Sequence, residues 1–184
     1  MLIKNVSSKI CFVGDGGVGK TSLICRFVHD LFDDKYLATI GTKVSRKEIV
    51  LDYPDKNLRF KMDAMIWDIM GQKAFRGMLQ GSYFHGAKGI LGVCSLNDKD
   101  SLNNLNDWIE SVKAVVGEIP IVLLANKNDL KDDVQFDDGD LKEMANSLNA
   151  TYLYTSAKTG ENVGQAFSTI AKQMIKNQFK LDKL

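Results

Sequence analysis

The chain lacks any large excess of charge. Its 24 Lys and Arg side chains face 23 Asp and Glu, which leaves a net charge of +1 over 184 residues. A protein without a broad basic field does not attract nucleic acid or a bilayer non-specifically. We therefore expect no nucleic-acid partner, and any charged interaction surface must be local.

Long apolar runs are also missing. No uninterrupted run approaches the roughly 18 residues of a membrane-spanning helix, and the start of the chain holds no signal-peptide core. The sequence thus predicts neither a membrane span nor export. Its 45% hydrophobic and 26% charged residues are typical of globular proteins, so we expect a single domain over residues 1–184, as a monomer.

Cysteine pairs and metal-binding cysteine motifs are missing as well. The cysteines are odd in number and show no C-x-x-C or Cys/His spacing; they are Cys11, Cys25 and Cys94. Their apolar surroundings are typical of core positions. We expect all of them to be buried and reduced, which indicates a cytoplasmic protein.

Short apolar runs rich in β-branched residues alternate with segments of helical periodicity. The runs predict buried strands over residues 9–14, 89–95, 121–125 and 151–154. The periodic segments predict helices over residues 102–116, 141–148 and 163–174, the last with Asn162 as its N-cap. This alternation predicts an α/β fold, a mostly parallel sheet with helices on both faces and ligands at the carboxyl ends of the strands.

Residues 43–68 interrupt the alternation. Two extended segments flank residues 53–57, in which Pro54, Asp55 and Asn57 favour a turn. We expect a long hairpin here, with the one antiparallel pairing of the sheet.

A phosphate-binding motif follows the first predicted strand and opens a helix. It has the form G-x-x-x-x-G-K-[ST], extended by Ser22, and reads Gly14-Asp15-Gly16-Gly17-Val18-Gly19-Lys20-Thr21. Glycines let backbone N–H groups curl around a phosphate chain, and the helix points its positive end at it. Lys20 can reach the β- and γ-phosphates, and the Thr21 hydroxyl can bind Mg²⁺. The motif predicts a nucleoside triphosphate site.

Two further motifs follow later strands and select the base. They read Asn126-Lys127-Asn128-Asp129 and Thr155-Ser156-Ala157-Lys158. The Asp129 carboxylate can accept both N1–H and N2–H of guanine, and the Ala157 N–H can donate to O6. Adenine offers the opposite polarity, so these motifs disfavour an ATP-driven enzyme. Taken alone, Asp129 could instead cap a turn, and Lys127 could be a solvated surface charge.

These motifs, in this order, resemble those of Ras-superfamily small GTPases, most of all the Rab branch, over residues 9–178. The resemblance implies a P-loop NTPase fold with six strands, one of them antiparallel, that binds GTP or GDP with Mg²⁺. By resemblance, Asn126 tethers the base loop to the phosphate loop, the Lys127 stem covers the base, and Ser156, Ala157 and Lys158 complete the base site. Phe32 occupies the position of the family's base-flanking aromatic, although it could equally be a core residue.

The resemblance also implies two switch segments. Asp68-Ile69-Met70-Gly71-Gln72 matches the family's D-x-x-G-Q, which assigns Asp68 to Mg²⁺ through water, the Gly71 N–H to the γ-phosphate and Gln72 to the attacking water. Thr39 matches the threonine of the first switch, which binds Mg²⁺ and the γ-phosphate. Hydrolysis would remove the ligand that both segments share.

We expect slow intrinsic hydrolysis carried by Lys20, Thr39, Gly71 and Gln72. No arginine can be assigned to the transition state, because the candidates look like solvated charges: Arg26, Arg46, Arg59 and Arg76. The expected partners are therefore effectors, an exchange factor and a GTPase-activating protein that supplies an arginine. The alternative is a guanine-nucleotide binding module with negligible hydrolysis.

Several positions depart from the family pattern. Ile69 and Met70 replace small residues, Lys73 replaces an acid, and the predicted hairpin is several residues longer than usual. The added bulk beside the metal site suggests altered Mg²⁺ affinity or GDP release.

Two surface features leave alternatives open. Trp67, Phe75 and Tyr83 match the branch's aromatic effector cluster but could simply pack. The last residues carry no cysteine, so the prenylation signal of the branch is missing and membrane anchoring is not encoded in this chain. Lysines at helical spacing near the end are either a solvated helix face or a contact for anionic lipid, and these are Lys172, Lys176 and Lys180.

Overall fold

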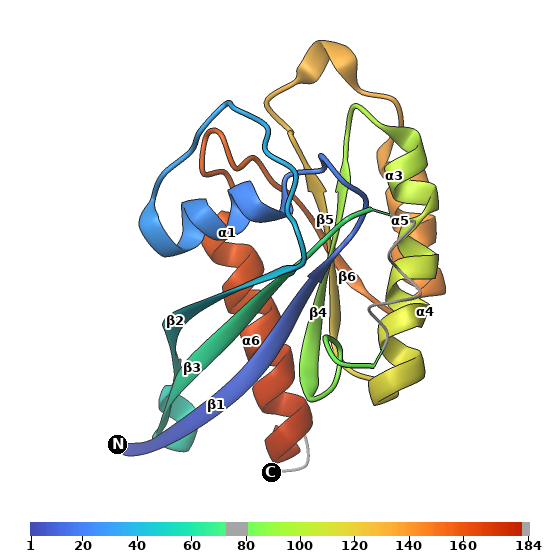
Figure 1. The fold of residues 1–184 in the computed structure, drawn as a ribbon. Coiled ribbons are helices and arrows are strands. Elements are labelled where there is room, and N and C mark those ends of the chain that lie inside the picture. Colours follow the sequence, from blue (N-terminus) through green and yellow to red (C-terminus); the bar gives the residue numbers. More distant parts are fainter. Residues whose placement is uncertain (73–80, 182–184) are drawn as a thin grey trace.

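The computed structural model describes residues 1–72 and 81–181. Its centre is a six-stranded sheet in the order β2-β3-β1-β4-β5-β6 (Figure 1). The strands are β1 Leu2–Val13, β2 Thr42–Tyr53, β3 Leu58–Ile69, β4 Ala87–Ser95, β5 Ile121–Asn126 and β6 Thr151–Tyr154. Only β2 runs antiparallel to its neighbour. The predicted fold class is confirmed.

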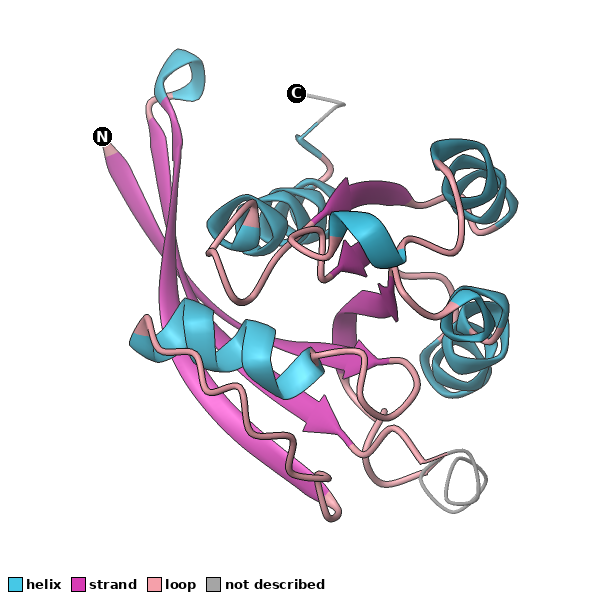
Figure 2. Ribbon diagram, turned by 90° about the horizontal axis from the view of Figure 1, so that it is seen from above, coloured by secondary structure: helices cyan, strands magenta, loops and turns pink. Residues whose placement is uncertain are grey.

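Helices cover both faces of the sheet (Figure 2). Their bounds are α1 Lys20–His29, α3 Lys99–Asn103, α4 Leu105–Val116, α5 Asp138–Ser147 and α6 Val163–Phe179, with short 3-10 turns η1 Pro54–Lys56 and η3 Lys131–Asp133. One core cluster joins α1 and α6 to the sheet, and a second joins α3, α4 and α5 to its other face. Burial of these apolar faces is the main stabilising term of the fold.

The hairpin lies where the sequence predicts it. β2 and β3 pair over their full 12 residues each, from Thr42↔Ile69 to Tyr53↔Leu58. The turn contains η1 and ends at Asn57, whose φ of 51° is one that Asn tolerates. Arg46 is exposed as expected and Arg59 is partly exposed, and each forms an ion pair across this hairpin, Arg46 with Asp63 and Arg59 with Asp52. Arg76 lies outside the described residues.

β1 begins earlier than predicted. Its first seven residues pair with β3 alone, and pairing with β4 starts at Lys9↔Ala87. The predicted strand began at Lys9 because polar residues precede it, but a strand that is exposed does not need a continuous apolar run. At the other end, Gly14 leaves the strand with a φ of 143°.

Two helix predictions need correction. The helix predicted over residues 102–116 is divided at Asn104, which ends α3 and begins α4. Asn162 precedes α6, but its side chain makes no capping hydrogen bond and instead donates to the Tyr154 carbonyl. The start of α5 has a capping box, Asp137 with Asp140, which the sequence analysis missed.

The cysteines differ from one another. Cys11 and Cys94 are buried as expected, and burial raises the pKa of each thiol to about 12. The prediction for Cys25 is wrong, because this residue is only half-buried and faces the pocket described below. None of the helices in the described ranges has the length and apolarity to cross a bilayer.

Candidate nucleotide-binding site

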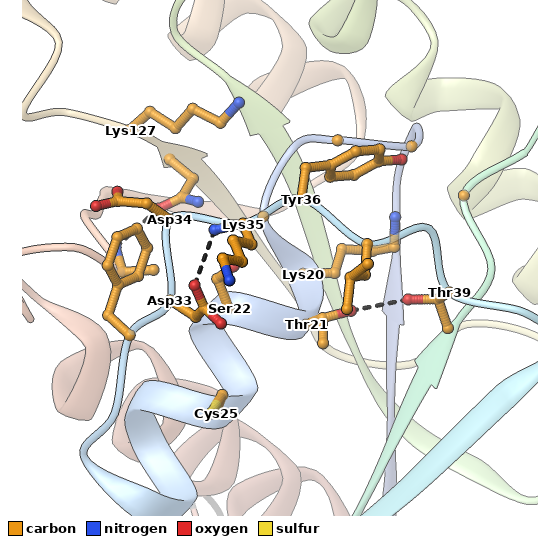
Figure 3. A pocket seen from close by; sticks show the side chains of 18 of the residues that line it. Lys20, Thr21, Ser22, Cys25, Asp33, Asp34, Lys35, Tyr36, Thr39 and Lys127 are labelled. Carbon is orange, nitrogen blue, oxygen red and sulfur yellow. Dashed lines mark hydrogen bonds between the residues drawn. The ribbon is translucent and has the colours of Figure 1, made fainter.

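A pocket of about 590 Å³ opens where β1, β3, β5 and β6 end (Figure 3). Its size suits a small-molecule ligand. The predicted site residues that line it are Gly16, Gly17, Gly19, Lys20, Thr21, Ser22, Phe32, Thr39, Gly71, Gln72, Asn126, Lys127, Asp129, Ala157 and Lys158. The other predicted site residues, Gly14, Asp15, Val18, Asp68 and Ser156, lie behind this lining. Residues distant in sequence thus meet at the carboxyl edge of the sheet.

The phosphate loop is shaped by close backbone approaches. A Cβ at Gly14 would lie 2.2 Å from the Val93 carbonyl oxygen, and one at Gly19 would lie 2.3 Å from the Asn126 amide nitrogen. Both residues also have positive φ, 143° and 100°. Only glycine satisfies both conditions, so the loop can fold tightly enough to present its N–H groups to an anion.

Lys20 supplies a buried cation in this loop. Its Nζ donates to the carbonyl oxygens of Gly14 and Asp15, both at 2.8 Å. Burial lowers the pKa of Lys20 to about 8, although the charges of Asp68 and Asp15 oppose the shift. A phosphate placed against this ammonium would restore the solvation that it has lost.

The three predicted metal ligands converge at one end of the pocket. The Thr21 hydroxyl donates to Asp68 Oδ2 at 2.5 Å and lies 2.9 Å from the Thr39 hydroxyl. Asp68 Oδ1 is buried and has no hydrogen-bond partner among the described residues. Burial also raises the pKa of Asp68, so its carboxylate lacks sufficient neutralising contacts.

This donor set fits Mg²⁺. Mg²⁺ prefers oxygen ligands and is commonly held by one or two carboxylates together with waters and substrate phosphates. Residues 1–72 and 81–181 contain no cluster of three or more His, Cys, Asp or Glu that would hold an ion without such help. Two hydroxyls and one carboxylate beside a phosphate loop therefore suit a Mg²⁺ ion whose other ligands are phosphate oxygens of the nucleotide and waters.

The second switch approaches the phosphate loop at Gly71. A Cβ there would lie 2.5 Å from the Gly16 nitrogen and 2.5 Å from Lys20 Nζ, so a larger residue could not occupy this place. Gln72 is exposed and lines the pocket beside it. Its catalytic role stays a prediction. Lys73 and Phe75, which the sequence analysis singled out, lie outside the described residues.

Asn126 also lines the pocket, and it links the phosphate loop to the second base motif. Its Nδ2 donates to the Val18 carbonyl at 2.9 Å, and its Oδ1 accepts from the Thr155 hydroxyl and from the Ala157 N–H. The Ala157 contact is long, 3.3 Å. That N–H, predicted to donate to guanine O6, is therefore only weakly engaged within the protein.

Asp129 and Lys127 both line the pocket, and Lys127 lies on the side away from Thr39 (Figure 3). The Ser156 hydroxyl donates to Asp129 Oδ1 at 2.6 Å, which fixes the carboxylate plane. Ser156 is therefore not part of the pocket lining but holds a residue that is. Lys127 has a φ of 65° and is half-buried, and burial lowers the pKa of its ammonium. A half-buried Lys127 does not fit the simple solvated charge that the sequence left open.

Arg26 is a site residue that sequence analysis missed. Its Nε donates to the Ala157 carbonyl at 2.9 Å and its Nη2 to the Lys158 carbonyl at 2.7 Å, while Nη1 pairs with Asp30. The expectation of a solvated arginine is therefore wrong. No local pattern could have revealed these contacts, because 131 positions separate Arg26 from Ala157.

The segment between α1 and β2 supplies one wall of the pocket. Asp33, Asp34, Lys35, Tyr36 and Leu37 line it together with Thr39, and Lys43 at the start of β2 does so too. Of these, only Thr39 was predicted. Phe32 lines the pocket and also packs against the first core cluster. It can therefore serve both as a core residue and as the aromatic beside the base.

The remaining family-specific positions that the structure describes are not among the residues that line the pocket. Trp67 and Tyr83 pack against the second core cluster, and Lys9 Nζ lies 3.6 Å from the centre of the Trp67 ring. Met70 is half-buried, and its N–H donates to the Gly41 carbonyl. Any influence of Met70 on Mg²⁺ affinity or GDP release stays a prediction.

With this geometry in hand, comparison with known proteins identifies the class. A sequence model of the Ras family matches residues 9–176, and the chain belongs to this family. It is therefore a small GTPase, an enzyme that hydrolyses GTP and switches between two nucleotide states.

One curated protein with a similar sequence shows which small GTPases this chain resembles. The chain is 36% identical over 167 residues to GTP-binding protein ypt1 of Schizosaccharomyces pombe, an alignment that covers 90% of this chain and 79% of the relative. The predicted resemblance to Rab-like small GTPases of the Ras superfamily is confirmed.

Proposed function

We propose that the pocket holds the guanine nucleotide with one Mg²⁺, the base between Lys127, Asp129 and Phe32 and the phosphates against the loop that ends at Lys20. The observation that carries this proposal is the convergence of Thr21, Thr39 and Asp68 beside Lys20. These groups come from the start of α1, the segment before β2 and the end of β3. This meeting of two hydroxyls and a carboxylate beside a buried ammonium suits a Mg²⁺ ion that also contacts the phosphates of the nucleotide.

In the proposed mechanism, water attacks the γ-phosphorus in line with the bond to the β-phosphate. That bond breaks, GDP leaves as the anion, and the proton of the water passes to the released phosphate. Lys20 and the Gly71 N–H stabilise the charge on the γ-oxygens, and Gln72 orients the water. Thr21, Thr39 and Asp68 would hold Mg²⁺, which would supply positive charge against the phosphates.

Slow turnover by the chain alone is part of the proposal. The described arginines are engaged elsewhere: Arg26 at the base loop, Arg46 and Arg59 on the hairpin. We propose an intrinsic rate of about 10⁻⁴ to 10⁻² s⁻¹, raised by an activating protein that supplies an arginine.

The exposed first switch suits recognition by effectors in the GTP state, and similarity to the Rab branch supports a place in membrane trafficking. Lys172, Lys176 and Lys180 are exposed, so a contact with anionic lipid is sterically open to them. Cytoplasmic residence, with transient contact at a membrane surface, is consistent with these features. Sedimentation with anionic vesicles at low salt tests the lipid contact, and no binding would remove it.

Two measurements test the nucleotide proposal. Mass spectrometry of the ligand released from the denatured protein should detect GDP, and displacement of labelled GDP by ATP as readily as by GTP would contradict guanine selection. Phosphate release over hours from the Gln72→Leu variant should fall well below that of the wild type. Equal rates would instead support a binding module with negligible hydrolysis.

A further inference from the structure

Asp15 is the one acidic residue of the phosphate loop, and its side chain is turned away from the pocket. It is buried, with only 8% of its surface exposed. Asn104 Nδ2 donates to Asp15 Oδ2 at 2.6 Å, and Trp108 Nε1 donates to Asp15 Oδ1 at 2.8 Å. Each carboxylate oxygen thus receives an N–H from the helical pair α3–α4.

The break between α3 and α4 brings these two donors together. Asn104 occupies the junction as the last cap of α3 and the first of α4. Trp108 lies four positions further on, so both side chains project from the same face of α4. Trp108 is fully buried among the second core cluster, where its indole N–H needs a partner and finds Asp15.

An anionic side chain in a phosphate loop needs an explanation. A carboxylate beside bound phosphates adds repulsion, and a buried carboxylate is costly unless it is hydrogen-bonded. Here the charge is directed toward neutral donors on a helix whose position is fixed by the core. Hydrogen bonds to a charged group are stronger than neutral ones, so the loop gains a rigid attachment.

The backbone of Asp15 touches the reacting end of the pocket. Its carbonyl oxygen accepts the Lys20 ammonium at 2.8 Å, and its carbonyl carbon lies 2.5 Å from the place where a Cβ on Gly71 would be. A movement of Asp15 would therefore displace Lys20 and alter the seat of Gly71. The hydrogen bonds that hold the Asp15 side chain therefore also hold the backbone of the phosphate loop in place.

We propose that Asn104 and Trp108 are positioning residues of the phosphate loop, which hold the Asp15 carboxylate so that the loop keeps its anion-binding shape and releases nucleotide slowly. The proposal rests on the proposed function, because it concerns the same pocket. It assigns to the α3–α4 junction a role in nucleotide affinity, although neither residue reaches the pocket lining.

The test follows release of fluorescently labelled GDP from the full chain, chased with unlabelled GDP in the presence of Mg²⁺. Trp108→Phe keeps an aromatic ring, although a smaller one, and removes the N–H donor, and release should become about tenfold faster. Asn104→Ala, at a half-buried site, removes the second donor and should speed release about threefold. Asp15→Ala should speed release at least as much as Trp108→Phe.

A cycle of variants separates positioning from packing. The double variant Asp15→Ala/Trp108→Phe should release GDP no faster than the faster single variant, because both remove the same attachment. Ile109→Val, which loses one methyl from a fully buried neighbour in α4, is the matched control. It should lower the melting temperature but change the release rate by less than about twofold.

The outcomes are distinct. Multiplicative effects in the double variant, or faster release in Ile109→Val to the same extent as in Trp108→Phe, would overturn the proposal in favour of general helix packing. Unchanged release in both Trp108→Phe and Asn104→Ala would also overturn it. If the wild type itself held no GDP, the proposed function would fail instead. Should Trp108→Phe not fold, the same cycle is run with Asn104→Ala.

Discussion

The two sides of the pocket are built differently. The side formed by the ends of β1, β5 and β6 is buried and internally bonded, with Asn126 linked to three backbone or side-chain groups. The opposite side, residues 30–41, contains neither helix nor strand. There Leu37 is 82% exposed and Ile40 93%, and Thr39 reaches the rest of the site through the Thr21 hydroxyl.

The two sides of the pocket therefore have different roles: one sets the affinity for the nucleotide, and the other changes its conformation with the nucleotide that is bound. The bonded side keeps its shape without a ligand and can bind base and phosphates with little cost of ordering. The exposed side has few contacts of its own, so its arrangement depends on what the pocket contains. A change on the first side should alter binding, whereas a change on the second should alter the consequence of binding.

The largest effect should come from Lys20 on the bonded side. Lys20→Met removes the buried ammonium but keeps an unbranched chain, and we expect affinity for GDP to fall by about a hundredfold or more. Calorimetry with Mg²⁺ measures it. Lys172→Met, on the exposed face of α6, is the matched control and should bind like the wild type. A loss below tenfold would mean that the loop N–H groups carry affinity by themselves.

Thr39 tests the exposed side. Thr39→Ala removes one hydroxyl from the proposed Mg²⁺ site, and we expect hydrolysis of bound GTP to slow about thirtyfold while GDP affinity changes less than about threefold. Single-turnover phosphate release and GDP binding give the two numbers. Equal losses in both would break the division between the two sides.

Arg26 should have an intermediate effect on the bonded side. Arg26→Ala frees the Ala157 and Lys158 carbonyls, so the base loop loses two charge-assisted hydrogen bonds and GDP release should become about tenfold faster. Labelled-GDP release measures this. Arg59→Ala on the hairpin is the control, since it removes only an exposed ion pair. Similar acceleration in both variants would refute a specific role of Arg26.

The smallest effect is that of pH. Burial lowers the pKa of Lys20 to about 8, and a bound phosphate favours the charged form. GDP affinity should therefore fall about fourfold between pH 7 and pH 8.5, as Lys20 loses its proton in the free protein. Lys20→Met should abolish this dependence. Calorimetry in buffers of different ionisation enthalpy should detect proton uptake on binding near pH 8.

The lowered pKa of Lys20 affects the stability of the free protein in the opposite direction, since it favours folding as pH rises. Burial holds the pKa of Lys20 in the folded protein below its ordinary value of 10.5. The unfolded chain therefore binds more protons between about pH 8 and pH 10.5, and the contribution of Lys20 to folding becomes more favourable as pH rises through that window. Urea denaturation of the nucleotide-free protein at pH 8 and pH 10 measures this contribution, with Lys20→Met as the reference.

Sequence predicted best what depends on local backbone chemistry. The phosphate motif, the two base motifs and the alternation of strands all lie where they were expected, because glycine placement and apolar periodicity are local properties. The hairpin was predicted for the same reason. The phosphate motif pointed to Thr21, and the resemblance to the family pointed to Thr39 and Asp68; the fold brings these three residues together from separate segments.

What sequence missed depends on distant partners. The break at Asn104 is invisible in a periodic apolar pattern, and the carboxylate that the Asn104 side chain contacts lies 89 positions away. Arg26 resembles any surface arginine until β6 and α6 place carbonyl groups beside it. The early start of β1 depends on the length of the hairpin next to it, which no single strand reveals.

Because β1 is long, its first part forms an edge of the sheet, whereas the neighbouring part of β3 is an inner strand. β3 has a strand on each side along almost its whole length, whereas the segment of β1 before Lys9 has a neighbour only toward β3. Backbone amides held between two strands open to solvent far less often than those at a boundary. In deuterated water, the far end of β3 should therefore keep its protons long after the neighbouring amides of β1 have exchanged.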